Sequence, residues 1–344
     1  MVRESHTPKN SDSQSETRSH LIGQGSHGCA FVPPLPCKQT KVKKSKKGLI
    51  VGKIIDKRHA DIELDVANLV KGIIGWDRYF IVQEEDNCNS ENFKRERGTY
   101  ETACNIMKSM KNKNLTQIIS PYGGSTLQSM SITSSFDFLG SFKHLLDGIA
   151  KLQNQGICHY DLKSNNIVID YTGTFRIIDF GSAFLGDGIN KNNIWRHQYS
   201  FLPEYTPQPP ELSVQNGIHS NFGYSRSIQE TIQQKKIFKT MENIFGIPIE
   251  KYQEELTAFW NEDTTWKGDT WVDFFHAYWR VWDAWAIGAI YIKLLEKCFL
   301  HQTFVNEVWP FHGAIIRQVL KGLLMPDPRK RLSCVEAAKL LEFY

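Results

Sequence analysis

Two short polar segments constrain this 344-residue chain more than any other feature. The first, residues 159–166, reads His-Tyr-Asp-Leu-Lys-Ser-Asn-Asn, and the second, Asp-Phe-Gly, starts at Asp179. Alone, the Asp-x-Lys-x-x-Asn pattern of Asp161, Lys163 and Asn166 is typical of an ordinary polar loop. Carboxylate and amide oxygens are ligands that suit Mg²⁺, and a lysine beside them can neutralise phosphate charge. The two segments together therefore indicate a site for metal ions and the phosphates of a nucleotide.

These segments resemble the catalytic loop and the metal-binding loop of eukaryotic-type serine/threonine protein kinases, His-Arg-Asp-Leu-x-x-x-Asn and Asp-Phe-Gly. The resemblance implies that Asp161 accepts the proton of the substrate hydroxyl and that Lys163 neutralises the phosphoryl group in transfer. It implies that Asn166 and Asp179 bind Mg²⁺, with Mn²⁺ as an alternative. Lys163 matches the serine/threonine type of the family rather than the tyrosine type. The chain departs from the family at Tyr160, where arginine is usual.

A glycine-rich string precedes these segments. Gly23, Gly25 and Gly28 form G-x-G-x-x-G, which alone is weak evidence and equally fits a tight turn. A dinucleotide-binding Rossmann unit shares the string but needs a helix directly after it, and three prolines among residues 33–36 forbid that helix. A hairpin whose tip lacks Cβ atoms can instead present backbone N–H groups to phosphates. The string therefore fits a kinase-like glycine-rich loop better.

A lysine, Lys53, lies inside an apolar, β-rich run, where a charge needs a partner. In the kinase family a lysine of the third strand binds the α- and β-phosphates and pairs with a helical glutamate. Glu63, in the helix expected over 60–74, is the candidate partner and is counted with Lys53 among the catalytic residues. Asp61 and Asp65 are the alternatives, and a plain surface carboxylate also remains open. Where the family usually has Val-Ala-x-Lys, this chain has Ile-Val-Gly-Lys.

The resemblance also implies where ATP binds. A strand over 115–120 runs into Pro-Tyr-Gly-Gly, which is similar to the kinase hinge whose backbone contacts adenine. The nucleotide-binding residues that follow from the resemblance are Ile22, Gly23, Gly25, Gly28, Ala30, Val51, Lys53, Pro121, Tyr122 and Gly123.

Three later motifs bear on the class of kinase. Pro-Pro-Glu ending at Glu211, Asp-Ala-Trp-Ala-Ile-Gly starting at Asp283, and Asp-Pro-Arg-Lys-Arg ending at Arg331 resemble three structural motifs of protein kinases. Glu211 and Arg331 are expected to form a buried, bidentate salt bridge, because a guanidinium fork matches a carboxylate. Small-molecule kinases usually lack this trio, which disfavours that alternative. A pseudokinase scaffold is a second alternative, disfavoured because Lys53, Asp161 and Asp179 are all present.

The predicted fold is α+β, a two-lobed protein-kinase-like fold with a small β-rich N-lobe and a larger helical C-lobe. The expected organisation is a disordered tail at 1–20, an N-lobe with hinge at 21–124 holding inserts at about 33–48 and 84–114, and a C-lobe at 125–344 holding an insert at about 212–270.

The 212–270 insert is expected to contain two helices. A capping-box pattern at Ser227 starts an apolar stripe that Gly246 stops, and Pro248 starts the second helix. The large apolar side chains of the insert either pack on the C-lobe or dock a partner protein; both remain open.

The resemblance implies ATP and a protein substrate as partners, and composition argues against nucleic acid and a membrane. The net charge of +4 is too small to indicate nucleic acid, and no apolar run reaches membrane-spanning length. The seven cysteines show no paired spacing and are expected to be free thiols in a reducing compartment. The six lysines of 37–47 form either a solvated loop or an anionic docking patch.

The N-terminus shows no apolar leader, so a cytoplasmic location is expected. The compact hinge and the long inserts look similar to kinases encoded by large cytoplasmic DNA viruses. That likeness implies the host cytoplasm or the virion as the location.

Overall fold

The structure is a computed structural model, and it describes residues 19–25, 28–36, 49–83, 88–89, 104–109, 114–268 and 270–342. The Lys-rich loop 37–47, nearly all of the tail expected at 1–20 and most of the insert expected at 84–114 lie outside the described residues. The chain divides into two compact units, residues 1–57 with 84–122 and residues 58–83 with 123–344.

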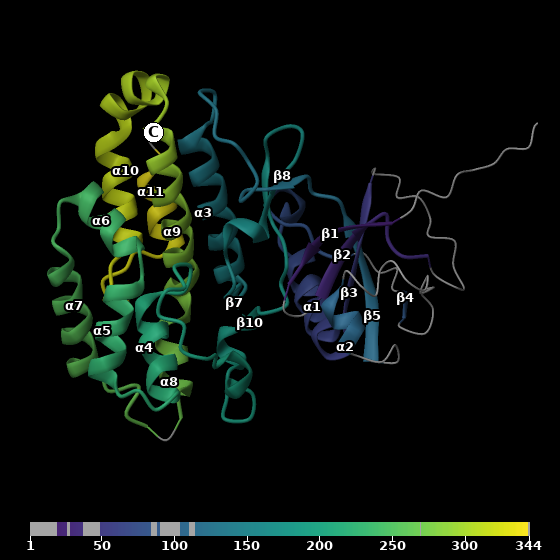
Figure 1. The fold of residues 1–344 in the computed structure, drawn as a ribbon, viewed down its shortest axis with the longest axis horizontal. Coiled ribbons are helices and arrows are strands. Elements are labelled where there is room, and N and C mark those ends of the chain that lie inside the picture. The colour runs from purple at the N-terminus through teal and green to yellow at the C-terminus, as the bar shows by residue number, and fades with distance from the viewer. Residues whose placement is uncertain are drawn as a thin grey trace, which may run out of the picture. The chain divides into compact units, whose positions relative to one another are not determined.

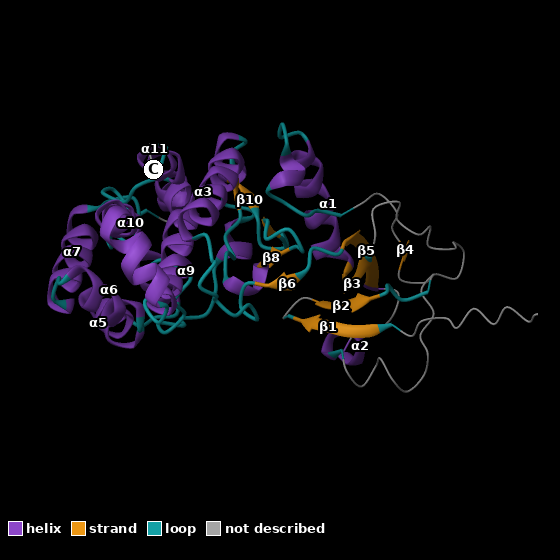
Figure 2. Cartoon of the chain, turned by 90° about the horizontal axis from the view of Figure 1, so that it is seen from above, coloured by secondary structure: helices purple, strands orange, loops and turns teal. Residues whose placement is uncertain are grey.

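The first unit is built on a five-stranded antiparallel sheet in the order β1-β2-β3-β5-β4 (Figure 2). Its elements are β1 (His20–Gln24), β2 (Gly28–Val32), β3 (Ile50–Asp56), β4 (Cys88–Asn89), α2 (Asn105–Ser109) and β5 (Leu115–Pro121). The element that follows the glycine-rich string is thus a strand. A Rossmann unit would have a helix there, so the structure excludes the Rossmann alternative, while phosphate binding by the string stays a prediction.

One face of this sheet is buried in a small apolar core that includes Phe31, Ile54 and Met107. Cys29 and Cys104 lie in the same core and form a disulfide, with Cα atoms 6.0 Å apart. The expectation that every cysteine is a free thiol is therefore wrong for this pair. The two cysteines lie 75 residues apart, so no local spacing reveals them. Three others, Cys158, Cys298 and Cys334, are free and buried.

Gly52, which stands where the family usually has alanine, is explained by a buried glutamine. Gln117 accepts the Leu35 N–H at 2.8 Å and donates to the Leu35 carbonyl at 2.9 Å. A Cβ at Gly52 would collide with the Gln117 side chain and with Pro34. The glycine therefore leaves room for the glutamine that fastens the segment after β2.

The second unit is mostly helical (Figure 1). Its helices are α1 (Lys57–Lys71), α3 (Phe138–Asn154), α4 (Pro210–His219), α5 (Tyr224–Gln234), α6 (Ile237–Phe245), α7 (Ile249–Glu262), α8 (Val272–Tyr278), α9 (Trp282–Cys298), α10 (Trp309–Leu323) and α11 (Cys334–Leu340). Two small sheets accompany them, β6 (Ser125–Thr126) with β8 (Ile167–Ile169) and β9 (Phe175–Ile177), and β7 (Ile157–Cys158) with β10 (Phe184–Leu185). In the described part of the chain, no helix is long and apolar enough to cross a membrane.

Helix α9 joins two apolar cores of the second unit. Ile287 and Tyr291 face a core shared with α3, α10 and α11, where the Tyr291 ring stacks on Phe142 at 4.2 Å. Trp282 and Trp285 face a second core, built with α4 to α8. Because α9 is buried on nearly all sides, its side chains are fixed from both directions.

Residues 212–270, which the sequence predicts to be an insert, supply much of the second core. Helix α7 starts after Pro248, as predicted, but the capping box at Ser227 is wrong. The Ser227 hydroxyl donates to the Gly223 carbonyl at 2.7 Å, and α5 already begins at Tyr224. The single helix expected up to Gly246 is broken at Lys235 into α5 and α6.

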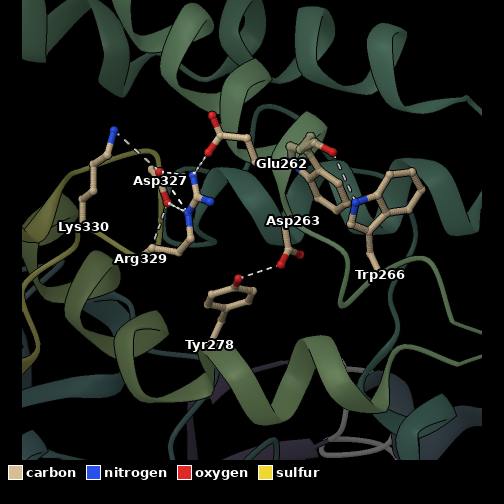
Figure 3. Close-up of polar contacts among 8 residues, drawn as sticks. Glu262, Asp263, Trp266, Tyr278, Asp327, Arg329 and Lys330 are labelled. Carbon is tan, nitrogen blue, oxygen red and sulfur yellow. Dashed lines mark hydrogen bonds and ion pairs between the residues drawn. The ribbon is translucent and has the colours of Figure 1, made fainter.

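Polar contacts fasten the end of α7 to the rest of the unit (Figure 3). Arg329 Nη2 donates to Glu262 Oε2 at 2.9 Å and to Asp327 Oδ2 at 2.7 Å. The Tyr278 hydroxyl donates to Asp263 Oδ1 at 2.9 Å. The large apolar side chains of the insert are also buried, so of the two open alternatives the structure favours packing over partner docking.

The salt bridge predicted between Glu211 and Arg331 is confirmed. Arg331 Nη1 and Nη2 donate to the two carboxylate oxygens of Glu211, each at 2.7 Å, and both side chains are fully buried. Arg331 Nε donates to the Met325 carbonyl at 2.9 Å. This pair ties the start of α4 to the segment before α11.

Arg331→Ala is expected to lower the free energy of unfolding by about 3–5 kcal/mol, because it leaves the Glu211 carboxylate buried without its partner. Lys330→Ala is the matched control, since its side chain is 57% exposed and its Nζ lies 3.7 Å from Asp327. Thermal and urea unfolding of both variants measure the difference. Equal, small losses in the two variants would contradict a buried pair. Arg329 is unsuitable as a control because it holds Glu262.

Candidate active site

Asp283, in the first turn of α9, holds the 159–166 loop by its backbone. Its Oδ2 accepts the His159 N–H at 2.7 Å, and its Oδ1 accepts the Tyr160 N–H at 3.0 Å. Asp283 is almost fully buried, and burial raises the pKa of its carboxyl while these hydrogen bonds oppose that rise. His159 Nε2 in turn donates to the Ile178 carbonyl at 3.1 Å, next to the Asp-Phe-Gly segment.

Tyr160 adopts a left-handed backbone conformation, with φ of 66°. For a residue with a bulky side chain this costs on the order of 1–3 kcal/mol, and it persists only where its surroundings impose it. Its hydroxyl donates to the His197 carbonyl at 2.7 Å. Its ring packs against Phe184 and Trp282, at centroid distances of 5.2 Å and 5.6 Å. Tyr160 therefore connects the loop to the segment that follows β10.

The carboxylate of Asp161 collects three hydrogen-bond donors. Lys163 Nζ donates to Oδ2 at 2.7 Å, and Asn166 Nδ2 donates to the same oxygen at 3.1 Å and to the Asp161 carbonyl at 2.8 Å. The Tyr205 hydroxyl donates to Oδ1 at 3.2 Å. The structure thus brings Asp161, Lys163 and Asn166 together and adds Tyr205, which the sequence did not indicate.

Asn166 and Asp179 are joined by backbone pairing. The Ile178 N–H donates to the Asn166 carbonyl at 2.9 Å, and β8 and β9 form the hairpin between the two segments. Because the Asn166 amide nitrogen donates to Asp161, its side-chain oxygen is the atom suited to bind a cation. Asp179 has a left-handed φ of 67°, a strained geometry typical of a functional loop.

This donor set suits Mg²⁺, which proteins commonly hold by one or two side chains together with substrate phosphates. Among the described residues there is no group of three or more His, Cys, Asp or Glu that could hold a metal ion. A site made of one carboxylate and one amide oxygen does not require such a group.

Glu63 is distinguished from Asp61 and Asp65 by burial. Its side chain is 1% exposed, whereas Asp61 and Asp65 lie on the exposed face of α1. Gln83 Nε2 donates to Glu63 Oε2 at 2.5 Å. Glu63 Oε1 would lie 2.8 Å from a Cβ added to Gly181, so the carboxylate adjoins the Asp-Phe-Gly segment.

Lys53 lies in the middle of the sheet of the first unit. It is paired with Ala30 of β2 on one side and with Ile118 of β5 on the other. Since side chains alternate along a strand, Val51 shares its face. Ala30, Val51 and Lys53 are half-buried, opposite the closed apolar core of this unit. Lys53 and Glu63 belong to different units, so their pairing stays a prediction.

The glycine-rich hairpin is partly described. Gly23 pairs with Ala30, and the Gly25 N–H donates to the Gly28 carbonyl at 2.9 Å. A Cβ at Gly28 would collide with the Ile54 carbonyl, so this glycine is required by packing as well. Ile22 is exposed, with 51% of its surface accessible.

The expected hinge lies where the chain passes from the first unit to the second, between Tyr122 and Gly123. Pro121 ends β5, and the Tyr122 N–H donates to the Leu49 carbonyl at 2.9 Å. A Cβ at Gly123 would collide with Ile81 and Val168, so this glycine is needed for packing. Contact of these residues with adenine stays a prediction.

His197, whose carbonyl accepts the Tyr160 hydroxyl, carries a perturbed imidazole. Its ring lies against Phe184 at 4.7 Å, and among the described residues its Nδ1 has no hydrogen-bond partner. Burial, and then the nearby Arg196 charge, lower the pKa of His197 to about 4.

This shift makes stability depend on pH. An unfolded histidine binds a proton near pH 6.5, well before the folded one, so stability is lost as pH falls from about 6.5 to about 4. At pH 5 this loss amounts to ~2 kcal/mol. His197→Phe is expected to remove it, whereas His219→Phe, at an exposed position, should keep the wild-type pH profile. Urea unfolding at pH 7 and pH 5 tests this; identical profiles for wild type and His197→Phe would refute it.

Comparison with known proteins agrees with this geometry. The model of the protein kinase domain matches residues 17–341. The chain is 23% identical to a serine/threonine-protein kinase of Candida glabrata over 59% of this chain and 29% of that protein. It is 24% identical to a MAP kinase kinase kinase of Saccharomyces cerevisiae over 56% of this chain and 11% of that protein. It is 29% identical to cell division control protein 7 of Schizosaccharomyces pombe over 34% of this chain and 11% of that protein.

The matched segments span less than a third of the length of these relatives. The domain match, in contrast, covers nearly the whole of this chain. The chain therefore belongs to the protein kinase family.

Proposed function

We propose that this chain is a serine/threonine protein kinase that uses ATP and Mg²⁺ and phosphorylates hydroxyls of a protein substrate. The observation that carries the proposal is the environment of Asp161, whose carboxylate lies 2.7 Å from Lys163 Nζ and beside the Asn166 amide. In phosphoryl transfer the protein mainly positions the reactants and neutralises charge, and these side chains supply both.

Each residue has a distinct role in this proposal. Asp161 accepts the proton of the substrate hydroxyl, and Lys163 stabilises the negative charge of the phosphoryl group. The Asn166 oxygen and Asp179 would hold Mg²⁺, which neutralises phosphate charge when bound. Lys53 binds the α- and β-phosphates, and buried Glu63 orients it. The half-buried face of β2 and β3 and the glycine-rich hairpin contact the nucleotide.

The type of substrate follows from the later motifs. The buried Glu211–Arg331 pair and the Asp283 clamp on the 159–166 loop are features that small-molecule kinases usually lack. Lys163 supports the serine/threonine type. Both arguments favour a protein substrate with serine or threonine acceptors.

We also infer that ordering of the activation segment, residues 182–211, does not require its phosphorylation. In many kinases the arginine that Tyr160 replaces pairs with a phosphate on this segment. Tyr160 carries no charge, and its hydroxyl holds the His197 carbonyl instead. Arg196 is the alternative phosphate partner; it is exposed, and its guanidinium lies over the Trp195 ring at 5.4 Å.

A viral origin and a cytoplasmic location stay proposals that rest on the hinge and the inserts.

Asp161→Asn is expected to lower phosphoryl transfer at least about 100-fold, since a general base contributes about 10²–10⁴-fold to the rate. Asp179→Ala should abolish Mg²⁺-dependent transfer. Asp187→Asn, which changes an exposed carboxylate of the activation segment, should leave the rate unchanged.

The measurement is transfer of labelled phosphate from γ-labelled ATP to a generic protein substrate, with phosphoamino-acid analysis of the product. Wild-type activity in Asp179→Ala would contradict the metal assignment. A chain that binds nucleotide but transfers nothing would instead be a pseudokinase scaffold.

A further inference from the structure

The activation segment is held just before α4 by buried donors from two other elements. Lys235 Nζ donates to the Tyr205 carbonyl at 2.6 Å and to the Gln208 carbonyl at 3.1 Å. Trp285 Nε1 of α9 donates to the intervening Thr206 carbonyl at 3.1 Å. Three carbonyls within four residues are thereby fixed, so this stretch has little freedom to move.

Lys235 is an unusual residue for this task because it is 1% exposed. Removing an ammonium from water is costly unless it is paired or hydrogen-bonded. Burial lowers the pKa of Lys235 to about 7, against the attraction of Glu211 and Glu204. The two carbonyls satisfy two of its three donor positions, and bonds from a charged donor are stronger than neutral ones.

The position of Lys235 explains the break in the insert. It caps the end of α5, and α6 starts two residues later at Ile237. Lys235 continues the apolar stripe of Ile228 and Ile232 at helical spacing, so it faces the same buried side as they do. A lysine on an apolar stripe is thus the feature of the sequence that indicates a buried cation here.

Tyr205 connects this clamp to the proposed catalytic base. Its carbonyl accepts from Lys235, and its hydroxyl donates to Asp161 Oδ1 at 3.2 Å. One end of the residue is therefore fixed by the insert, and the other end touches the carboxylate. The insert itself is anchored by the buried side chains of α5 to α7 and by the Arg329–Glu262 contact (Figure 3).

We propose that Lys235 is a positioning residue, supplied by the insert, that fixes the backbone of Tyr205 so that the Tyr205 hydroxyl orients the Asp161 carboxylate. The inference rests on the proposed kinase function and adds a role for the insert. In this proposal the insert contacts its own chain rather than a partner protein. It fixes the position of the activation segment relative to Asp161 without a charged contact at residue 160.

The test compares Lys235→Met, which has a similar length and no donor, with Lys236→Met at the exposed neighbouring lysine. Turnover is measured per nucleotide-binding site, so that unfolded protein does not count. Lys235→Met is expected to lower turnover about tenfold with little change in KM for ATP, because misplacement of a reacting group slows chemistry. Lys236→Met should match wild type.

Tyr205→Phe removes only the hydroxyl and should cause a loss of similar size. Because both residues act through one chain of contacts, the double variant should lose about as much as the worse single variant, not the roughly hundredfold product. Multiplied losses, or unchanged turnover in Lys235→Met, would overturn the proposal. If Lys235→Met does not fold, unchanged turnover in Tyr205→Phe overturns it.

Hydrogen exchange of the nucleotide-free chain gives a second readout that does not depend on activity. Peptides from 198–211 should exchange faster in Lys235→Met than in Lys236→Met, because the clamped stretch opens locally. Equal exchange in these two variants would contradict the clamp. A wild-type chain without any transfer activity would defeat the proposed function, while the exchange comparison would still decide whether the clamp exists.

Discussion

The buried carboxylate of Asp283 is the contact on which the arrangement of the site depends. It is placed by α9, a helix enclosed by two apolar cores, and it accepts two consecutive backbone N–H groups of the 159–166 loop. Tyr160, which donates one of these two bonds, has a left-handed backbone conformation that a residue with a bulky side chain ordinarily avoids. In this loop Asp161 accepts hydrogen bonds from Lys163 and Asn166, and the Tyr160 ring packs against the second core. Because the packing of α9 fixes Asp283, it also fixes the backbone of the 159–166 loop.

The activation segment is held by hydrogen bonds from two neutral donors and one buried lysine to its backbone carbonyls. The Tyr160 hydroxyl donates to the His197 carbonyl, and the Trp285 indole donates to the Thr206 carbonyl. The buried Lys235 ammonium donates to two carbonyls, those of residues 205 and 208. The Glu211–Arg331 pair fastens the end of the segment. A phosphorylated segment would be ordered by a surface charge pair, which salt weakens. Buried hydrogen bonds are less sensitive to salt, which supports the proposal that folding itself orders this segment.

The sequence was informative where chemistry fixes both residue type and spacing. The two-lobed kinase fold, the salt bridge between Glu211 and Arg331, and the grouping of Asp161 with Lys163 and Asn166 followed from motifs. Contacts between residues distant in sequence were not accessible in this way: the Cys29–Cys104 disulfide and the Tyr205–Asp161 bond depend on packing that no local pattern encodes. The capping box predicted at Ser227 is wrong because the Ser227 hydroxyl donates to the Gly223 carbonyl. The single helix predicted there ends at Lys235, whose side chain is buried. The apolar insert suggested a docking surface only because its partner, the face of α9, could not be seen from the sequence.

We propose that folding alone orders the activation segment in the arrangement needed for phosphoryl transfer. The most direct test is the specific activity of the chain before and after phosphatase treatment, with mass spectrometry confirming that residues 182–211 carry no phosphate. We expect the two activities to agree within about twofold, because Tyr160 and Lys235 hold the segment through its own backbone carbonyls. A large loss of activity on dephosphorylation, restored when a residue of 182–211 is phosphorylated again, would contradict it and would point to Arg196 or another cation as the phosphate partner.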